Sequence, residues 1–224
     1  MKLKTENVER MYFRTGRNTN FFYAVKSLDF ELKEGAVTVI TGRSGSGKTT
    51  LINMLCGLLT PSSGRVMLDD KDLYSISDKE RSLLRNRCFG IIPQGQTGLQ
   101  CLTVAENVLL PVSMYGRIGD KENKARTLLE KLGIDDLWDV YSNELSGGEL
   151  RRMSTARALI NDPDIIIADE PTGDLDDDTT KFVMELLNDY AKKGASVLIV
   201  THDKDVLPYA DMSYTMENGV LKEV

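Results

Sequence analysis

A glycine-rich segment, Gly42–Thr49, constrains the fold of this chain most, because it matches the phosphate-binding pattern GxxxxGK[ST] in full. Such a loop functions where a strand ends and a helix begins. The short apolar run Val37–Thr41 predicts a buried strand immediately before the loop. After it, an i, i+3, i+4, i+7 apolar pattern that starts at Leu51 predicts an amphipathic helix beginning at Lys48. The sequence therefore predicts a strand–loop–helix unit of an α/β fold.

The chemistry of this loop predicts nucleoside triphosphate binding. Its glycines let backbone N–H groups converge on phosphate oxygens, and the helix N-terminus adds positive potential. Lys48 would reach the outer phosphates, and Thr49 would ligate Mg²⁺. A chance Gly/Ser-rich turn matches this pattern in roughly one chain in a hundred. The expected binding residues are Gly42, Arg43, Ser44, Gly45, Ser46, Gly47, Lys48, Thr49 and Thr50.

Two adjacent carboxylates, Asp169 and Glu170, follow the apolar strand candidate Ile165–Ala168. The carboxyl end of a buried strand is the edge where α/β sheets bind ligands. Asp169 would hold magnesium, directly or through water, and Glu170 would orient and deprotonate the attacking water. The alternative is a solvated strand-end pair that leads into a turn at Pro171.

A second glycine-rich segment, Leu145–Glu149, reads LSGGE and lies about a hundred residues after the loop. Ser146 and Glu149 have the S-x-x-E spacing of a capping box, which predicts a helix start. Gly147 and Gly148 would bare backbone N–H groups there, making an anion site that has no lysine of its own. The two interpretations are compatible, and the second suggests that one subunit closes over the nucleotide held by another.

His202 and Gln94 are further candidates because each follows a predicted strand. A lone histidine is usually structural or lies at the surface. His202, however, follows the predicted strand Ser196–Thr201 at the ligand edge, and this position favours a contact with the γ-phosphate. Gln94 follows Phe89–Pro93. It is either an ordinary loop amide or a ligand of magnesium and water whose position reports the nucleotide state.

The remaining pattern divides the chain into a core and an inserted lobe. Residues 94–161 are rich in turns and helical segments, including a predicted helix over Lys121–Leu132. A helix over Thr179–Lys193 then precedes the strand Ser196–Thr201, so β and α alternate as in a parallel sheet. The C-terminal residues 214–222 predict a hairpin with Asn218-Gly219 as its turn.

Composition narrows the class of protein. Acidic residues outnumber basic ones by 34 to 28, and the resulting net charge of -6 provides no positive field for nucleic acid.

Cys56, Cys88 and Cys101 lack metal-binding spacing, so we expect buried thiols in a reduced, cytosolic protein. No stretch approaches the roughly 20 apolar residues that cross a bilayer, and the start has no signal-peptide core. A partner would therefore supply any membrane crossing.

Together these segments resemble the ATP-binding cassette (ABC) ATPase family over essentially the whole chain. Six motifs occur in the family's order, which makes the resemblance highly specific. They are Walker A (Gly42–Thr49), the Q-loop (Gln94), the signature (Leu145–Glu149), Walker B with its catalytic glutamate (Ile165–Glu170), the D-loop (Thr172–Asp176) and the H-switch (His202).

The resemblance implies the architecture and the reaction. It implies one domain with a P-loop NTPase (RecA-like) core from residues 1–93 and 162–224, an antiparallel β-subdomain, and an inserted α-helical subdomain at 94–161. It also implies head-to-tail dimers with two ATP molecules, and Mg²⁺, sandwiched between Walker A of one subunit and Ser146–Glu149 of the other. Glu170, His202, Lys48 and Gln94 would be catalytic, and the D-loop residues Asp174 and Asp176 would lie at the dimer seam.

An aromatic residue that stacks on adenine is also implied. Tyr12 is the best-placed candidate, while Phe21, Phe22 and Tyr23 remain alternatives because the segment after Tyr12 is longer than in many relatives.

A finer resemblance is carried by Leu102–Pro111, Phe89–Gln94 and Pro171–Asp176. These segments are similar to the ATPases of the macrolide-exporter and lipoprotein-releasing group, which includes antimicrobial-peptide export systems. That implies a separate membrane permease and a cytoplasmic subunit held on the inner face of the cell membrane through it. The permease would select the cargo, and either a homodimer or a heterodimer of cassettes is compatible with the sequence.

Two residues depart from the family's pattern. Glu149 ends the signature where glutamine is commoner, and Asp174 replaces a frequent asparagine in the D-loop. Both add negative charge at the expected seam without removing a catalytic group, so we expect intact but slow hydrolysis. The competing classes are a soluble ABC protein acting on nucleic acid or ribosomes and a GTP-dependent switch. The chain carries no basic linker or zinc module for the first, and no NKxD motif for the second.

Overall fold

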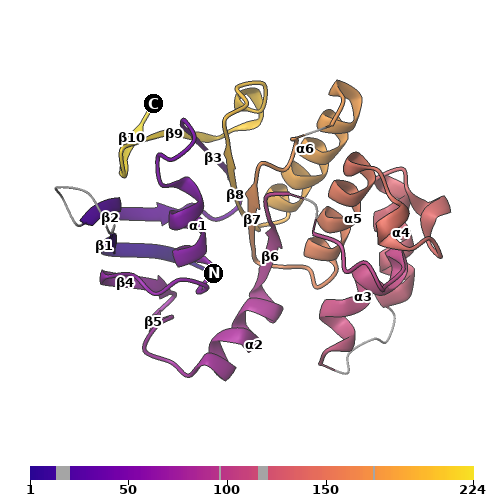
Figure 1. The fold of residues 1–224 in the computed structure, drawn as a ribbon, viewed down its shortest axis with the longest axis horizontal. Helices are drawn as coiled ribbons and strands as arrows, with labels where there is room; N and C mark the ends of the chain where they lie inside the picture. The colour runs from indigo at the N-terminus through magenta and orange to yellow at the C-terminus, as the bar shows by residue number, and fades with distance from the viewer. Residues whose placement is uncertain (14–20, 96, 116–120, 174) are drawn as a thin grey trace.

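The computed structural model describes residues 1–13, 21–95, 97–115, 121–173 and 175–224. A six-stranded sheet runs through its middle, between a four-stranded antiparallel sheet and a group of helices (Figure 1). The described residues therefore form an α/β fold, as the sequence predicted.

The six-stranded sheet carries the phosphate loop. Its order is β10-β9-β3-β8-β7-β6, and the neighbours from β9 to β6 are parallel. Its strands are β3 (Val37–Thr41), β6 (Phe89–Ile92), β7 (Ile165–Asp169), β8 (Ser196–Thr201), β9 (Met212–Glu217) and β10 (Val220–Glu223). The last two form the predicted hairpin, and the positive φ angles of Asn218 (49°) and Gly219 (81°) suit its tight two-residue turn.

The central strands β3, β7 and β8 are mostly apolar because both faces of the sheet are buried there. In β7, Ile165 and Ile167 pack on the side of the antiparallel sheet, while Ile166 and Ala168 pack on the side of the helices. Helix α1 (Lys48–Leu55) fills the space between the two sheets, and its Leu51 is fully buried there. This packing fixes the start of α1, and with it the phosphate loop, against the end of β3.

The antiparallel sheet has the order β2-β1-β4-β5. It comprises β1 (Leu3–Phe13), β2 (Phe21–Leu32), β4 (Ser63–Leu68) and the two-residue β5 (Lys71–Asp72). Helix α2 (Asp78–Cys88) follows, and Cys88 is its one buried residue. The sequence pattern did not reveal α2 because a helix with so little apolar surface has no periodic face.

The other helices are α3 (Val104–Ser113), α4 (Lys121–Lys131), α5 (Gly147–Leu159) and α6 (Asp177–Lys192), with short 3₁₀ turns η1 (Asp135–Leu137), η2 (Ser142–Glu144) and η3 (Leu207–Tyr209). Helices α3 to α5 all fall within the stretch that the sequence assigned to a helical lobe, and they lie together on the far side of the sheet from β1 (Figure 1). Helix α5 packs tightly on β6, since a Cβ at Gly90 would lie 2.6 Å from the Ala158 carbonyl oxygen.

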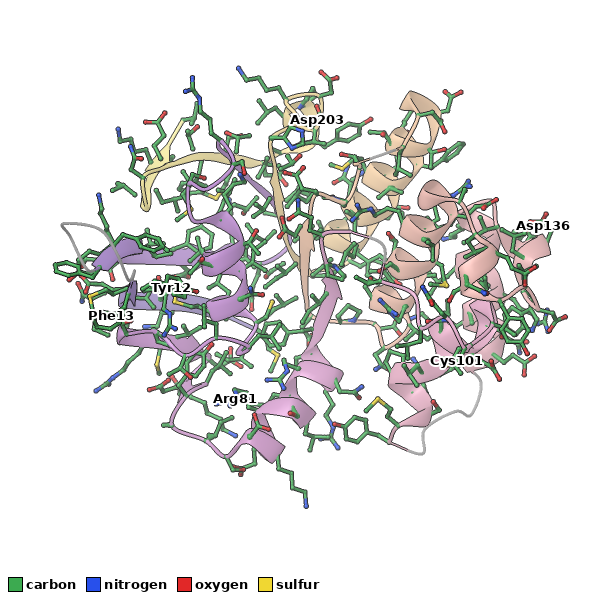
Figure 2. The ribbon with its side chains drawn as sticks, viewed as in Figure 1. Tyr12, Phe13, Arg81, Cys101, Asp136 and Asp203 are labelled. Carbon is green, nitrogen blue, oxygen red and sulfur yellow. The ribbon has the colours of Figure 1, made fainter. Side chains whose placement is uncertain are left out.

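The cysteines differ in environment. Cys56 and Cys88 are buried, and burial raises the pKa of the Cys56 thiol to about 12. Cys101 is exposed, so the expectation that all three thiols are buried is wrong for this residue. It lies in a loop before α3, where no apolar surface covers it (Figure 2). Among the described residues, no helix is long and apolar enough to cross a membrane.

Candidate active site

The predicted site residues meet at the carboxyl edge of the parallel sheet. Because β3, β7 and β8 are parallel and β8 pairs with both others, the segments that follow them are neighbours. They border a cleft of about 680 Å³. Its lining residues are Tyr12, Phe22, Ala24, Arg43, Ser44, Gly45, Gly47, Lys48, Thr49, Thr50, Gln94, Asp169, Glu170 and His202.

The phosphate loop can be built only with glycine at its last turn. Gly47 has a φ of 109°, and a Cβ there would lie 2.0 Å from the Ala24 carbonyl oxygen. Both the conformation and the close approach exclude a side chain. Ser46 is buried beside it, and its hydroxyl has no hydrogen-bond partner among the described residues. Ser46, like Gly42, borders a neighbouring cavity and is not among the residues that line this cleft.

Lys48 begins α1 and is itself buried. Its Nζ donates to the carbonyl oxygens of Gly42, at 2.6 Å, and Arg43, at 3.1 Å. These bonds hold the ammonium group against the loop and on the wall of the cleft. A positive charge and the N-terminus of α1 therefore act on the same volume, which favours an anion.

Thr49 and Asp169 face each other across the cleft floor. The Thr49 hydroxyl donates to Asp169 Oδ2 at 3.0 Å. Asp169 is only 5% exposed, and this burial raises the pKa of its carboxyl group above the usual value. A buried carboxylate of this kind, paired with a hydroxyl, is an oxygen donor set that suits a hard divalent cation.

Glu170 lies one residue further on, but its carboxylate is turned toward β8. Its backbone has a φ of 53°, in the left-handed region, and its N–H donates to the Val200 carbonyl oxygen at 2.8 Å. The Thr201 hydroxyl donates to Glu170 Oε2 at 2.7 Å, and the His202 N–H donates to Oε1 at 3.1 Å. Glu170 as a whole residue is 8% exposed, and it borders the cleft.

His202 contacts the same carboxylate through its ring. Its Nδ1 lies 2.8 Å from Glu170 Oε1. This hydrogen bond, together with the negative charge of Glu170, raises the pKa of His202 above its usual value, although the ring itself is largely exposed. The structure thus brings His202 and Glu170 together at the ends of the paired strands β8 and β7.

The aromatic candidates separate into two groups. Tyr12 and Phe22 line the cleft and stack on each other, with ring centroids 5.7 Å apart. Phe21 and Tyr23 point elsewhere, since neither borders the cleft and their exposed fractions are 49% and 39%. Figure 2 shows Tyr12 on the side of the molecule formed by β1 and β2.

Gln94 is exposed at the end of β6 and lines the cleft. A neighbouring residue that the sequence did not reveal is Arg151 of α5. It is 5% exposed and donates to the Pro93 carbonyl oxygen at 3.0 Å, so it ties α5 to the residue before Gln94. Arginine in a helix normally signals a solvated face, and no sequence feature marked this one as buried.

The signature residues lie apart from this cleft. Ser146 caps α5, with its N–H donating to Glu149 Oε2 at 2.7 Å and its Oγ accepting from the Glu149 N–H at 3.4 Å. The predicted capping box is therefore present. Gly147 and Gly148 form the first turn of α5, and none of these four residues is among those that line the cleft.

Of the two D-loop residues, Asp174 lies outside the described part of the chain. Asp176 caps α6, because its Oδ1 accepts from the Thr179 N–H at 2.9 Å. This hydrogen bond, together with one from the Thr179 hydroxyl to Oδ2 at 2.9 Å, lowers the pKa of the Asp176 carboxyl group. The structure thus gives Asp176 a capping role that the sequence had not suggested.

Comparison with known proteins agrees with this geometry. A family model described as "ABC transporter" matches residues 25–173. The macrolide export ATP-binding/permease protein MacB of Campylobacter fetus is 38% identical over 218 residues, which are 97% of this chain but 34% of that protein. The lipoprotein-releasing system ATP-binding protein LolD of Cytophaga hutchinsonii is 39% identical over 199 residues, 88% of this chain and 91% of that protein. These relatives confirm the resemblance to the macrolide-export and lipoprotein-releasing group.

Solved structures extend the likeness to the fold. The ATP-binding cassette MJ0796, solved as a dimer in a post-hydrolysis state bound to ADP and Pi, superimposes with a TM-score of 0.90 at 32% identity. The match covers 99% of this chain and 98% of that one. The family model, the relatives and the fold agree: the chain belongs to the ABC transporter family and is one of its ATP-binding, ATP-hydrolysing cassettes.

Proposed function

We propose that two copies of this cassette close over two ATP molecules and drive a separate membrane permease. One observation carries the proposal. The cleft that holds Lys48 and Glu170 is not bordered by the signature residues of the same chain, although Ser146 is exposed at a helix start suited to an anion. A second copy in head-to-tail arrangement supplies that missing wall. The dimer of MJ0796, which is bound to ADP and Pi, supports this arrangement.

Within the cleft each charged group has a distinct task. Lys48 and the backbone N–H groups of the loop bind the outer phosphates. Glu170 orients the attacking water and accepts its proton, while His202 contacts the γ-phosphate beside it. In trans, Ser146 and Gly147 approach the γ-phosphate from the other side. Charge stabilisation and positioning then supply most of the catalysis, as phosphoryl transfer requires.

We also propose that Mg²⁺ is held by Thr49 and Asp169, with Gln94 as a third ligand. No cluster of three or more His, Cys, Asp or Glu side chains able to hold a metal occurs in the described residues. That fits magnesium, which takes one or two protein oxygens and completes its shell with phosphates and water. When bound, the ion neutralises charge on the transferred phosphate.

The assignment of the base is tested by Glu170→Gln. This variant keeps the size and most hydrogen bonds of the side chain but cannot accept a proton. We expect Mg-ATP binding close to that of the unchanged chain and turnover reduced by roughly a hundredfold or more. Glu185→Gln is the matched control, since Glu185 is exposed on α6 and its ion pair with Lys181 is long, at 3.9 Å. Retained hydrolysis in Glu170→Gln would place the base elsewhere.

The permease partner, and a position on the inner face of the cell membrane through it, rest on the relatives. MacB carries "ATP-binding/permease" in its name, and this chain spans about a third of it. Tagged Glu170→Gln, loaded with Mg-ATP and recovered from detergent-solubilised membranes, should bring down a stoichiometric multi-span protein. Recovery of ribosomal or nucleic-acid partners alone, with the cassette absent from membranes, would contradict the transport role.

A further inference from the structure

Thr201, the last residue of β8, occupies a position that the reaction scheme above does not use. It is fully buried, and its hydroxyl lies between Glu170 and the turn that follows His202. Oγ1 accepts a hydrogen bond from the Asp203 N–H at 2.9 Å and donates one to Glu170 Oε2 at 2.7 Å. Because a hydroxyl has a single proton, the acceptor role toward Asp203 leaves that proton for the carboxylate. The direction of the bond to Glu170 is thereby fixed.

The two oxygens of Glu170 are held by different donors. Oε1 receives the His202 N–H, and Oε2 receives the Thr201 hydroxyl. The backbone of Glu170, with its φ of 53°, is in a conformation that non-glycine residues rarely adopt, so surrounding contacts must maintain it. Thr201 is suited to this because a β-branched side chain in a strand has few accessible rotamers.

We propose that Thr201 is a positioning residue for ATP hydrolysis, whose hydroxyl holds the Glu170 carboxylate on the β8 side of the cleft, in the orientation that receives the proton of the attacking water. The proposal rests on the role of Glu170 proposed above. Thr201 is fully buried and is not among the residues that line the cleft, so its hydroxyl acts through Glu170. The Thr201 hydroxyl affects the geometry of the base. Its loss should therefore lower the rate of the chemical step and leave the affinity for ATP unchanged.

A purely structural role predicts a different outcome. In that case the hydroxyl serves only the Asp203 N–H, and its loss lowers stability without a selective effect on kcat. Thr201→Val removes the hydroxyl at nearly constant volume, and Thr201→Ser keeps it. Thr38→Val is the matched control: Thr38 lies in neighbouring β3, is 1% exposed, and its hydroxyl has no partner among the described residues.

The measurement is steady-state ATP hydrolysis by the full chain, with thermal denaturation and Mg-ATP affinity recorded for each variant. We expect Thr201→Val to lower kcat about tenfold or more, with KM for ATP within about twofold. Thr201→Ser should restore kcat to within about threefold, and Thr38→Val should leave both constants unchanged. An unchanged kcat in folded Thr201→Val overturns the proposal, as does an equal loss in Thr201→Ser.

Two further arms keep the result decisive. If Thr201→Val does not fold, Thr201→Ser still tests the proposal, because retention of the hydroxyl predicts near-normal kcat and a Glu170→Gln-like loss contradicts it. Glu170→Gln distinguishes a failure of the role proposed for Thr201 from a failure of the role proposed for Glu170. If it abolishes turnover while Thr201→Val does not lower kcat, Thr201 is not a positioning residue and Glu170 remains the base. If Glu170→Gln hydrolyses ATP normally, the proposed role of Glu170 fails first.

Discussion

Asp169 and Glu170 are adjacent in the sequence, but their carboxylates have different surroundings. This difference supports the separate roles proposed for them. Asp169 is the last residue of β7 and meets Thr49 on the side of the phosphate loop. Glu170, with its left-handed backbone, turns toward β8 and meets Thr201 and His202. These contacts support the proposal that Asp169 holds a cation and Glu170 acts on water. The sequence predicted the pair, but not the backbone conformation that separates the two side chains.

The ring of His202 offers a direct test of its contact with Glu170. The chain has one histidine, so its imidazole signals in a proton NMR titration need no assignment. We expect a pKa above about 6.5, the usual histidine value, because Glu170 stabilises the protonated ring. In Glu170→Gln the negative charge is gone, and the pKa should fall back toward that value. Identical titration curves in the two proteins would show that the contact is absent in solution.

The sign of the linked effect on stability follows from the same shift. A folded-state pKa above the unfolded one means that the His202 contact stabilises the fold fully below about pH 6.5. That contribution is lost as the pH rises through the raised pKa. It is small, because the ring is largely exposed to solvent.

Asp169 is expected to control the dependence on magnesium. Asp169→Asn removes the charge but keeps the shape, so we expect the affinity for Mg-ATP to fall about tenfold or more, while ATP binding in EDTA changes little. Isothermal titration calorimetry with and without magnesium measures both. Asp70→Asn, which removes an exposed carboxylate in the turn between β4 and β5, is the control. Equal losses with and without magnesium would remove Asp169 from the metal site.

At the scale of elements, three helices begin with the same capping box. The pairs are Ser77 with Glu80 in α2, Thr103 with Glu106 in α3, and Ser146 with Glu149 in α5. In each, the cap side chain accepts from the third N–H, and the glutamate accepts from the cap N–H. In Ser146–Glu149 these bonds lower the pKa of the Glu149 carboxyl group. The signature motif is thus an ordinary helix start with two added glycines.

This repetition provides an internal control for the role of the signature. Ser77→Ala and Ser146→Ala remove equivalent caps, so each should lower the free energy of unfolding by about 1 kcal/mol. We expect only Ser146→Ala to lower ATP turnover, by about tenfold, because in the proposed dimer only the Ser146 hydroxyl meets a nucleotide. Urea denaturation and ATPase assays compare the two effects. Equal turnover in both variants would leave Ser146 as a cap alone.

Elements with strong local patterns were predicted closely. Strands β3 and β8 have the predicted bounds, Val37–Thr41 and Ser196–Thr201, because each is a mostly apolar run beside a turn. Helix α6 begins at Asp177 rather than Thr179, since the Asp176 cap extends it. The two-residue β5 has no alternation to detect. Its pairing with β4 arises from tertiary contacts that local sequence does not encode.

The site residues were predicted where strand order alone brings them together. Motifs that follow parallel neighbours must meet at one edge, and Lys48, Asp169, Glu170 and His202 border one cleft there. Arg151 and Thr201 were missed for a physical reason. Their importance depends on burial and on specific hydrogen bonds, to Pro93 and to Glu170, that exist only after packing.

At the scale of the whole molecule, the two halves of the proposed composite site lie on different parts of the chain. The phosphate loop joins β3 to α1, beside the antiparallel sheet, while the signature opens α5 among the helices (Figure 1). The negative charge at Glu149 would have to approach bound ATP in the closed dimer. The Ser146 N–H and hydroxyl both donate hydrogen bonds to this carboxylate, so part of its negative charge is compensated at the helix start.

The central claim, that ATP joins two copies of the chain, is tested most directly by sedimentation equilibrium of Glu170→Gln. With Mg-ATP we expect the mass to double, because nucleotide that is bound but not hydrolysed keeps both clefts closed. With Mg-ADP the mass should return to that of one chain. A single-chain mass at saturating Mg-ATP, with nucleotide binding shown in the same sample, would contradict the account.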